Sequence, residues 1–112
     1  MEMSAAITAC MCADAPGRNL DSLIAAAVFP ALEELPMIAA GIWRQCDGTH
    51  ARALRYSGSR SAAMTLVPAG YWIETYGNDV HVCGERGEWI GTHRIDTIAI
   101  CIAALKARLS DE

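Results

Sequence analysis

The pattern of hydrophobic and polar positions divides the chain near residue 37. Ahead of that point, apolar residues recur at the three- and four-residue spacing of an amphipathic helix, at Leu20, Leu23, Ile24, Ala27, Ala31 and Leu35. Asn19 or Asp21 can cap this helix, and Pro36 ends it. Because Pro30 lacks a backbone N–H, the sequence predicts a kink, or two short helices with Pro30 in the first turn of the second.

Beyond this point short apolar segments alternate with turns, which indicates strands. Cys46-Asp-Gly-Thr49 is the strongest turn signal, because Asp-Gly suits a two-residue type I′ hairpin loop. Pairing outward from that turn puts Trp43 opposite Arg52, a pair suited to cation–π stacking. The second strand of this hairpin is expected to reach a loop at 57–61, and residues 63–67 are expected to form a further strand.

Residues 71–92 predict a three-stranded antiparallel meander, with turns at Gly77-Asn78 and Gly84-Glu-Arg-Gly87. In this register Tyr76 faces Asp79 and Glu74 faces His81. Because side chains alternate along a strand, one face is the core face and carries Ile73, Thr75, Val80 and Val82. The other face carries Trp72, Glu74, Tyr76, Asp79, His81 and Cys83.

The last element is predicted to be a helix from about Asp96, its expected cap, to Leu109. One stripe of this helix is apolar and consists of Ile95, Ile98, Ile102, Leu105 and Leu109. Residues 97–105 carry no charge, so the helix should be buried on more than one side, between the sheet and the N-terminal helix or against another chain. The second arrangement predicts a homodimer through residues 97–105. The alternating isoleucines also fit a strand over 97–102, but strong helix formers follow them.

The expected architecture is α+β, in a single domain spanning 1–112. It consists of an N-terminal helical segment kinked at Pro30, an antiparallel sheet of about five strands, and a C-terminal helix packed on the sheet. Residues 4–12 are mostly apolar and fit either a strand or a first helical turn. No segment resembles a known family.

Composition and charge narrow the functional classes. Hydrophobic residues make up 53% and charged residues 20% of the 112 residues, as in folded globular proteins. The net charge of -4 argues against a general binder of nucleic acid or of anionic membranes, and no apolar run is long enough to span a membrane. The five cysteines, an odd number at irregular spacings, argue against a secreted disulfide framework and predict a reducing cytoplasm.

The non-core face of the meander is the first candidate site. Its aromatic residues and its acidic and histidine side chains have the composition of a protein-binding surface: Trp72, Glu74, Tyr76, Asp79 and His81. Alternatively, Glu74 orients His81 and Cys83 is the nucleophile of a thiol enzyme. Positions two apart on a strand lie about 6–7 Å apart, which is too far for a direct thiol–imidazole hydrogen bond. The simplest interpretation is a polar sheet face with a Glu–His cross-strand pair.

A zinc site is the second candidate. Three thiolates and one imidazole make a suitable ligand set, and the chain offers them at Cys10, Cys12, His81 and Cys83. The spacing within each pair is shorter than in the usual zinc knuckles, and free cysteines are commonly buried.

Two further groups have simpler interpretations. His93 falls on the core face of the meander, opposite to His81, and is expected near Asp96 at the start of the last helix. The arginines of the middle segment could bind phosphate or an acidic peptide, but their positions are scattered over two faces and a loop: Arg44, Arg52, Arg55 and Arg60.

The leading hypothesis is a small acidic cytoplasmic protein-interaction module of the regulator or inhibitor type. It would bind a protein partner through the non-core face of the meander or through the apolar C-terminal helix. Small proteins of this character are typical of mobile elements and phages. The alternatives are the zinc-binding protein and the thiol enzyme. The leading hypothesis assigns no catalytic residue, no metal and no cofactor.

Overall fold

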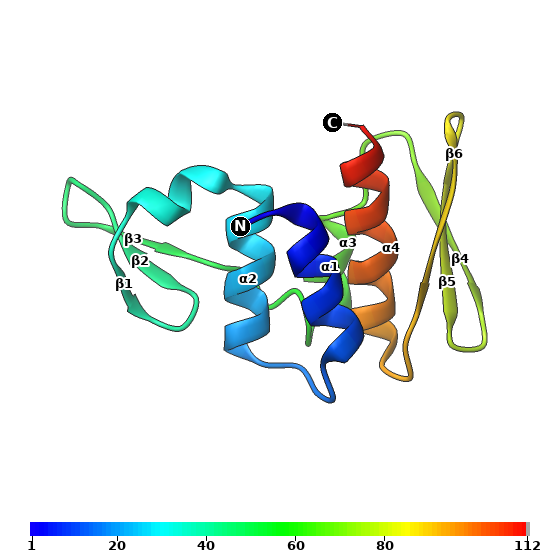
Figure 1. The fold of residues 1–112 in the computed structure, drawn as a ribbon, viewed down its shortest axis with the longest axis horizontal. Helices are drawn as coiled ribbons and strands as arrows, with labels where there is room; N and C mark the ends of the chain where they lie inside the picture. The colour runs from blue at the N-terminus through cyan, green and yellow to red at the C-terminus, as the bar shows by residue number, and fades with distance from the viewer. Residues whose placement is uncertain (112) are drawn as a thin grey trace.

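Two three-stranded antiparallel sheets stand at opposite ends of the molecule, with the helices between them (Figure 1). The computed structural model describes residues 1–111, and its principal axes measure 43 × 28 × 22 Å. The helices are α1 (Met3–Cys12), α2 (Arg18–Val28), the 3-10 helix η1 (Pro30–Glu34), α3 (Arg60–Met64) and α4 (Asp96–Ser110). Sheet A consists of β1 (Met37–Ala39), β2 (Ile42–Arg44) and β3 (His50–Arg52). Sheet B consists of β4 (Trp72–Tyr76), β5 (Asp79–Gly84) and β6 (Gly87–Thr92).

The α+β class is confirmed, but the prediction of one sheet of about five strands is wrong. Residues 63–67 do not form a strand, because α3 and the turn after it occupy this segment. The Ser59 hydroxyl accepts a hydrogen bond of 3.3 Å from the backbone N–H of Ala62 and so caps α3. Ala63 and Leu66 are buried in the core. No strand therefore joins sheet A to sheet B.

The hairpin of sheet A forms one residue out of the predicted register. Trp43 pairs with Ala51, and Arg52 lies opposite Ile42. The loop has three residues rather than two: Gly48 adopts a φ of 88° and donates to the Gln45 carbonyl at 3.0 Å. Trp43 therefore does not stack on Arg52 across the strands, and its side chain lies in the core, 2% exposed.

The N-terminal segment divides at Pro30 in the second of the two predicted ways. α2 ends at Val28, and η1 begins at Pro30. Neither Asn19 nor Asp21 caps α2, since Gly17 occupies the N-cap position and no side chain caps it. Residues 4–12, which fitted either a strand or a helical turn, lie within the helix α1.

Sheet B forms in the predicted register over its whole length. Tyr76 pairs with Asp79, Glu74 with His81, and Ile73 with Val82. Gly77 has a φ of 61°, as the first loop residue of a type II′ turn requires. The inner face of sheet B packs against α4.

The helix α4 occupies the centre of the molecule, between sheet B on one side and α1 and α3 on the other (Figure 1). The predicted helix is confirmed, although Ile95 rather than Asp96 is at its N-cap position. All residues of the uncharged segment 97–105 are buried, with exposures between 0 and 8%. The same chain therefore covers this segment, as in the first of the two predicted arrangements. Among residues 1–111, no helix is both long and apolar enough to cross a membrane.

A buried carboxylate, Asp21, joins α2 to the segment that follows sheet A. Its side chain is 3% exposed and accepts hydrogen bonds from the Ser57 backbone N–H at 2.8 Å and from the Ser57 hydroxyl at 2.6 Å. The Arg18 guanidinium donates to the other oxygen at 3.0 Å. From α4, the Thr97 hydroxyl donates to the Ser57 carbonyl at 2.6 Å. This polar network therefore fixes residue 57 between two helices.

Candidate functional site

The face of sheet B that is turned away from α4 is the candidate site, and we call it the outer face. Alternate residues of the three strands form it: Trp72, Glu74, Tyr76, Asp79, His81, Cys83, Glu88, Ile90 and Thr92. Trp72 is 53% exposed and Tyr76 58% exposed, so no element of residues 1–111 covers them. All five residues predicted for a partner-binding surface lie on this one face.

The carboxylate of Glu74 organises the outer face. The Trp72 indole N–H donates to its Oε2 at 3.0 Å, and the Tyr76 hydroxyl donates to its Oε1 at 2.5 Å. The three side chains are neighbours because positions two apart on a strand project from the same face. Hydrogen bonds from Tyr76 and Trp72 lower the pKa of Glu74. Glu74 is therefore an anion that holds two exposed aromatic side chains in fixed orientations.

His81 has a different carboxylate partner from the one predicted. Glu74 lies opposite His81 in the strand register, but the His81 Nδ1 pairs with the carboxylate of Glu88 on β6. The rings of His81 and Tyr76 also form an edge-to-face pair, with centroids 4.9 Å apart and planes at 76°. Glu88 therefore belongs to the site. Its register position opposite Cys83 could have indicated this from the sequence.

The thiol of Cys83 is placed next to carboxylates rather than next to the imidazole. Its Sγ lies 3.7 Å from Oε2 of Glu74, and it makes no hydrogen bond to His81. Partial burial, together with the negative charges of Glu74 and Glu88, raises the pKa of Cys83. A thiol enzyme needs the opposite shift, because the thiolate is the nucleophile. The arrangement expected for a Cys-His-Glu enzyme does not form.

The four residues predicted as zinc ligands lie apart. Cys10 and Cys12 lie on α1, where positions two apart point to different sides of the helix. Cys10 is accordingly buried and Cys12 is exposed. His81 and Cys83 lie beyond α4, on the outer face. Within residues 1–111, no three histidine, cysteine, aspartate or glutamate side chains form a metal-binding group.

His93 lies on the core side of the sheet, as predicted, but its partners differ. Its Nε2 lies 2.7 Å from the Ala13 carbonyl, and its Nδ1 accepts from the Ile95 N–H at 3.0 Å. Asp96, the expected neighbour, instead pairs with Arg60 at 3.2 Å. His93 therefore connects the end of α1 to the start of α4.

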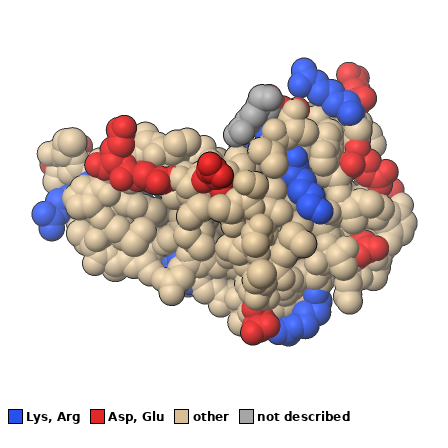
Figure 2. All heavy atoms as spheres, in the orientation of Figure 1, with Lys and Arg blue, Asp and Glu red and all other residues tan. Residues whose placement is uncertain are grey.

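The outer face has a one-sided charge. It carries the carboxylates of Glu74, Asp79 and Glu88 and no lysine or arginine. Acidic side chains are visible along the end of the molecule that sheet B forms, with basic side chains around them (Figure 2). Comparison of the chain with protein-family models, with curated proteins and with solved structures finds no match. The chemistry of the outer face is therefore the basis for assigning a function.

Proposed function

We propose that this protein is an interaction module that binds a basic segment of a partner protein on the outer face of sheet B. The observation that supports the proposal is that the side chains of Trp72 and Tyr76 are both exposed and are both held in place by hydrogen bonds. Both rings are more than half exposed, and both donate to the same carboxylate of Glu74.

Fixed aromatic side chains favour binding for an energetic reason. Ordering a free side chain at an interface costs roughly 0.5–1.5 kcal/mol, and a side chain that is already held avoids much of this cost. Tryptophan and tyrosine are also the residues most enriched at the energetic centres of interfaces. Trp72 and Tyr76 are therefore the residues expected to anchor a partner.

The charge of the outer face indicates the chemistry of the partner. Three carboxylates on a face that carries no lysine or arginine of its own favour a positively charged segment and accelerate its approach, although Lys106 lies at the edge of this face, on the Ile90 carbonyl. An arginine or lysine placed over the face of Trp72 or Tyr76 gains a cation–π interaction of roughly 0.5–1 kcal/mol. The same cation can pair with Glu74, whose two oxygens lie between the rings.

The proposed cellular role is that of a regulator or inhibitor. A small acidic module that presents one binding face suits a regulator or inhibitor, which acts by occupying a surface of its partner. The chain has five free cysteines, of which Cys12 and Cys46 are exposed. Exposed unpaired thiols suit a reducing compartment, so we propose the cytoplasm as the location.

A display library of short peptides tests the proposal without knowledge of the partner. Selection on the wild-type protein should enrich peptides rich in arginine or lysine. The double variant Trp72→Ala/Tyr76→Ala should bind these peptides at least tenfold more weakly, and the affinity for the wild type should fall as salt rises.

Phe29→Ala is the matched control, because Phe29 is 55% exposed and lies near sheet A, at the other end of the molecule. It should leave the affinity unchanged. Enrichment of acidic or uncharged peptides, or equal binding to the wild type and the Trp72/Tyr76 variant, would contradict the proposal.

A further inference from the structure

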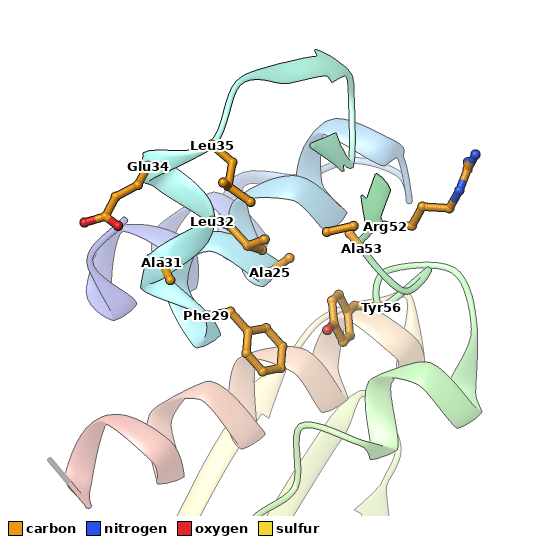
Figure 3. Close-up of a pocket in the computed structure, with 10 residues that line it drawn as sticks. Ala25, Phe29, Ala31, Leu32, Glu34, Leu35, Arg52, Ala53 and Tyr56 are labelled. Atoms are coloured by element: carbon orange, nitrogen blue, oxygen red, sulfur yellow. The ribbon is translucent and has the colours of Figure 1, made fainter. Parts of the chain in front are cut away.

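A concave apolar cleft lies far from the outer face, between the helical pair α2–η1 and the segment that follows β3 (Figure 3). Its volume is about 410 Å³, within the range of small-molecule sites. Its principal lining residues are apolar or aromatic: Ala25, Phe29, Leu32, Leu35, Ala53 and Tyr56. Residues of its floor are almost fully enclosed, with exposures of 1% for Ala25, 8% for Ala53 and 4% for Tyr56.

One polar group in this cleft has no partner. The Tyr56 hydroxyl makes no hydrogen bond to any group of residues 1–111, although Tyr56 is more than nine-tenths buried. Two other side-chain atoms that lack a partner, Ser22 Oγ and Tyr71 OH, are fully enclosed by protein. The Tyr56 hydroxyl differs from them because it is open to the cleft. The hydroxyl end of Tyr56 points toward Phe29, across the space that both side chains line (Figure 3).

We propose that this cleft binds a neutral, mainly apolar small molecule that carries one hydrogen-bond-accepting oxygen, and that the Tyr56 hydroxyl donates to that oxygen. The Tyr56 hydroxyl is open to the cleft, so a ligand oxygen there takes the place of water as its hydrogen-bond partner. The apolar walls exclude water from the bound molecule and contribute most of the affinity.

The charges around the cleft favour a neutral ligand over an ionic one. Glu34 and Arg52 stand at its edge with opposite charges, and both side chains point away from the enclosed space (Figure 3). None of the ionised side chains that line the cleft therefore faces its floor, and the positive charge of Arg108 acts on the Tyr56 hydroxyl from outside the lining. The Tyr56 hydroxyl is protonated and able to donate at neutral pH, as an ordinary tyrosine is, and burial raises its pKa further.

Two probes of matched shape test the assignment: 2-acetylnaphthalene, which carries a carbonyl oxygen, and 2-isopropenylnaphthalene, in which a methylene group replaces that oxygen. Titration of the full-length ¹⁵N-labelled protein, followed by NMR, should shift the amide signals of Ala25, Leu32 and Ala53. The ketone should bind roughly two- to tenfold more tightly, as expected for one hydrogen bond.

Tyr56→Phe should make the two probes bind equally while the fold remains intact, because the lost hydroxyl had no partner in the protein. Tyr71→Phe is the matched control: it removes another unpartnered tyrosine hydroxyl, one that does not line the cleft, and the preference for the ketone should persist. A preference for the ketone that survives in Tyr56→Phe overturns the proposal. So does the absence of shifts at Ala25 and Ala53, or a response confined to the amide signals around the exposed Phe29.

Discussion

Gly91 of β6 lies directly against the backbone of Ala99 in α4. A Cβ atom at position 91 would lie 2.2 Å from the Ala99 carbonyl oxygen and 2.7 Å from the Ala103 backbone nitrogen. Real side chains do not approach a backbone this closely. The absence of a side chain at this one position therefore sets how near sheet B comes to the central helix.

Gly91→Ala should lower the free energy of unfolding by about 2 kcal/mol or more, because the methyl group forces β6 away from α4. Urea denaturation followed by circular dichroism measures the change. Gly17→Ala is the control: Gly17 has an extended backbone, and nothing lies within 4 Å of an added Cβ. Equal stabilities of the two variants would contradict the close packing of β6 on α4.

The buried carboxylate of Asp21 gives a second prediction. Asp21→Ala should lower the free energy of unfolding by about 2–3 kcal/mol, because the Ser57 N–H and hydroxyl lose a charged acceptor. Asp96→Ala removes an aspartate whose side chain is 63% exposed and paired with Arg60, so it should cost well under about 1 kcal/mol. Thermal or urea unfolding distinguishes the two, and a similar loss in both variants would argue against the buried network.

The buried thiols predict a loss of stability at alkaline pH. Burial raises the pKa of Cys10 from 9.0 to about 12 and also raises the pKa of Cys101. Above pH 9 the unfolded chain releases these protons while the folded chain keeps them, so the folded state loses stability as the pH rises toward 12. Each thiol should contribute a slope of about 1.4 kcal/mol per pH unit.

Urea unfolding under reducing conditions at a series of pH values above 9 measures this slope. Cys101→Ala should make it shallower, whereas Cys46→Ala removes an exposed thiol and should not change it. A slope that is the same in the wild type and in Cys101→Ala would refute the role of the buried thiol.

The outer face predicts how Cys83 reacts. Because the negative charge of Glu74 contributes to the raised pKa of Cys83, Glu74→Gln should increase the thiolate fraction. The single amide oxygen of the variant can still accept from Trp72, and the Tyr76 hydroxyl can accept from the amide N–H instead of donating. Alkylation by iodoacetamide at pH 8, followed by peptide mass spectrometry, should therefore be several-fold faster at Cys83 in the variant. The rate at the exposed Cys46 serves as an internal reference. An unchanged ratio of the two rates would show that Glu74 does not control the thiol.

Sheet B was predictable residue by residue because the sequence constrains it in two ways. Glycine-containing turns at 77–78 and 84–87 fix the register, and the alternation of apolar and polar residues fixes the faces. The split into two sheets was not predictable in the same way. The alternation of residues 63–67 is typical of a strand. The capping hydroxyl of Ser59 is the one signal that favours a helix and turn in this segment.

The candidate site was predicted in its positions but not in its contacts. The register places His81 directly opposite Glu74, yet its side chain pairs with Glu88, which lies diagonally across on the next strand, and side-chain orientation decides between them. The apolar cleft gave no sequence signal. Its walls come from residues 25–35 and 51–56, and alanine, leucine and tyrosine at such positions are indistinguishable from core residues.

The central position of α4 has a consequence for the order in which the protein folds. α1 and α3 both pack on α4, which begins at Asp96. When residues 1–95 have been synthesised, the central helix of the core is therefore still absent. The pairing of α1 with α4 spans most of the chain, and contacts between such distant segments slow folding because a long loop must close first. The face of α1 that packs on α4 therefore has no partner from this helix until α4 has been synthesised, whereas α2 is available to α1 much earlier.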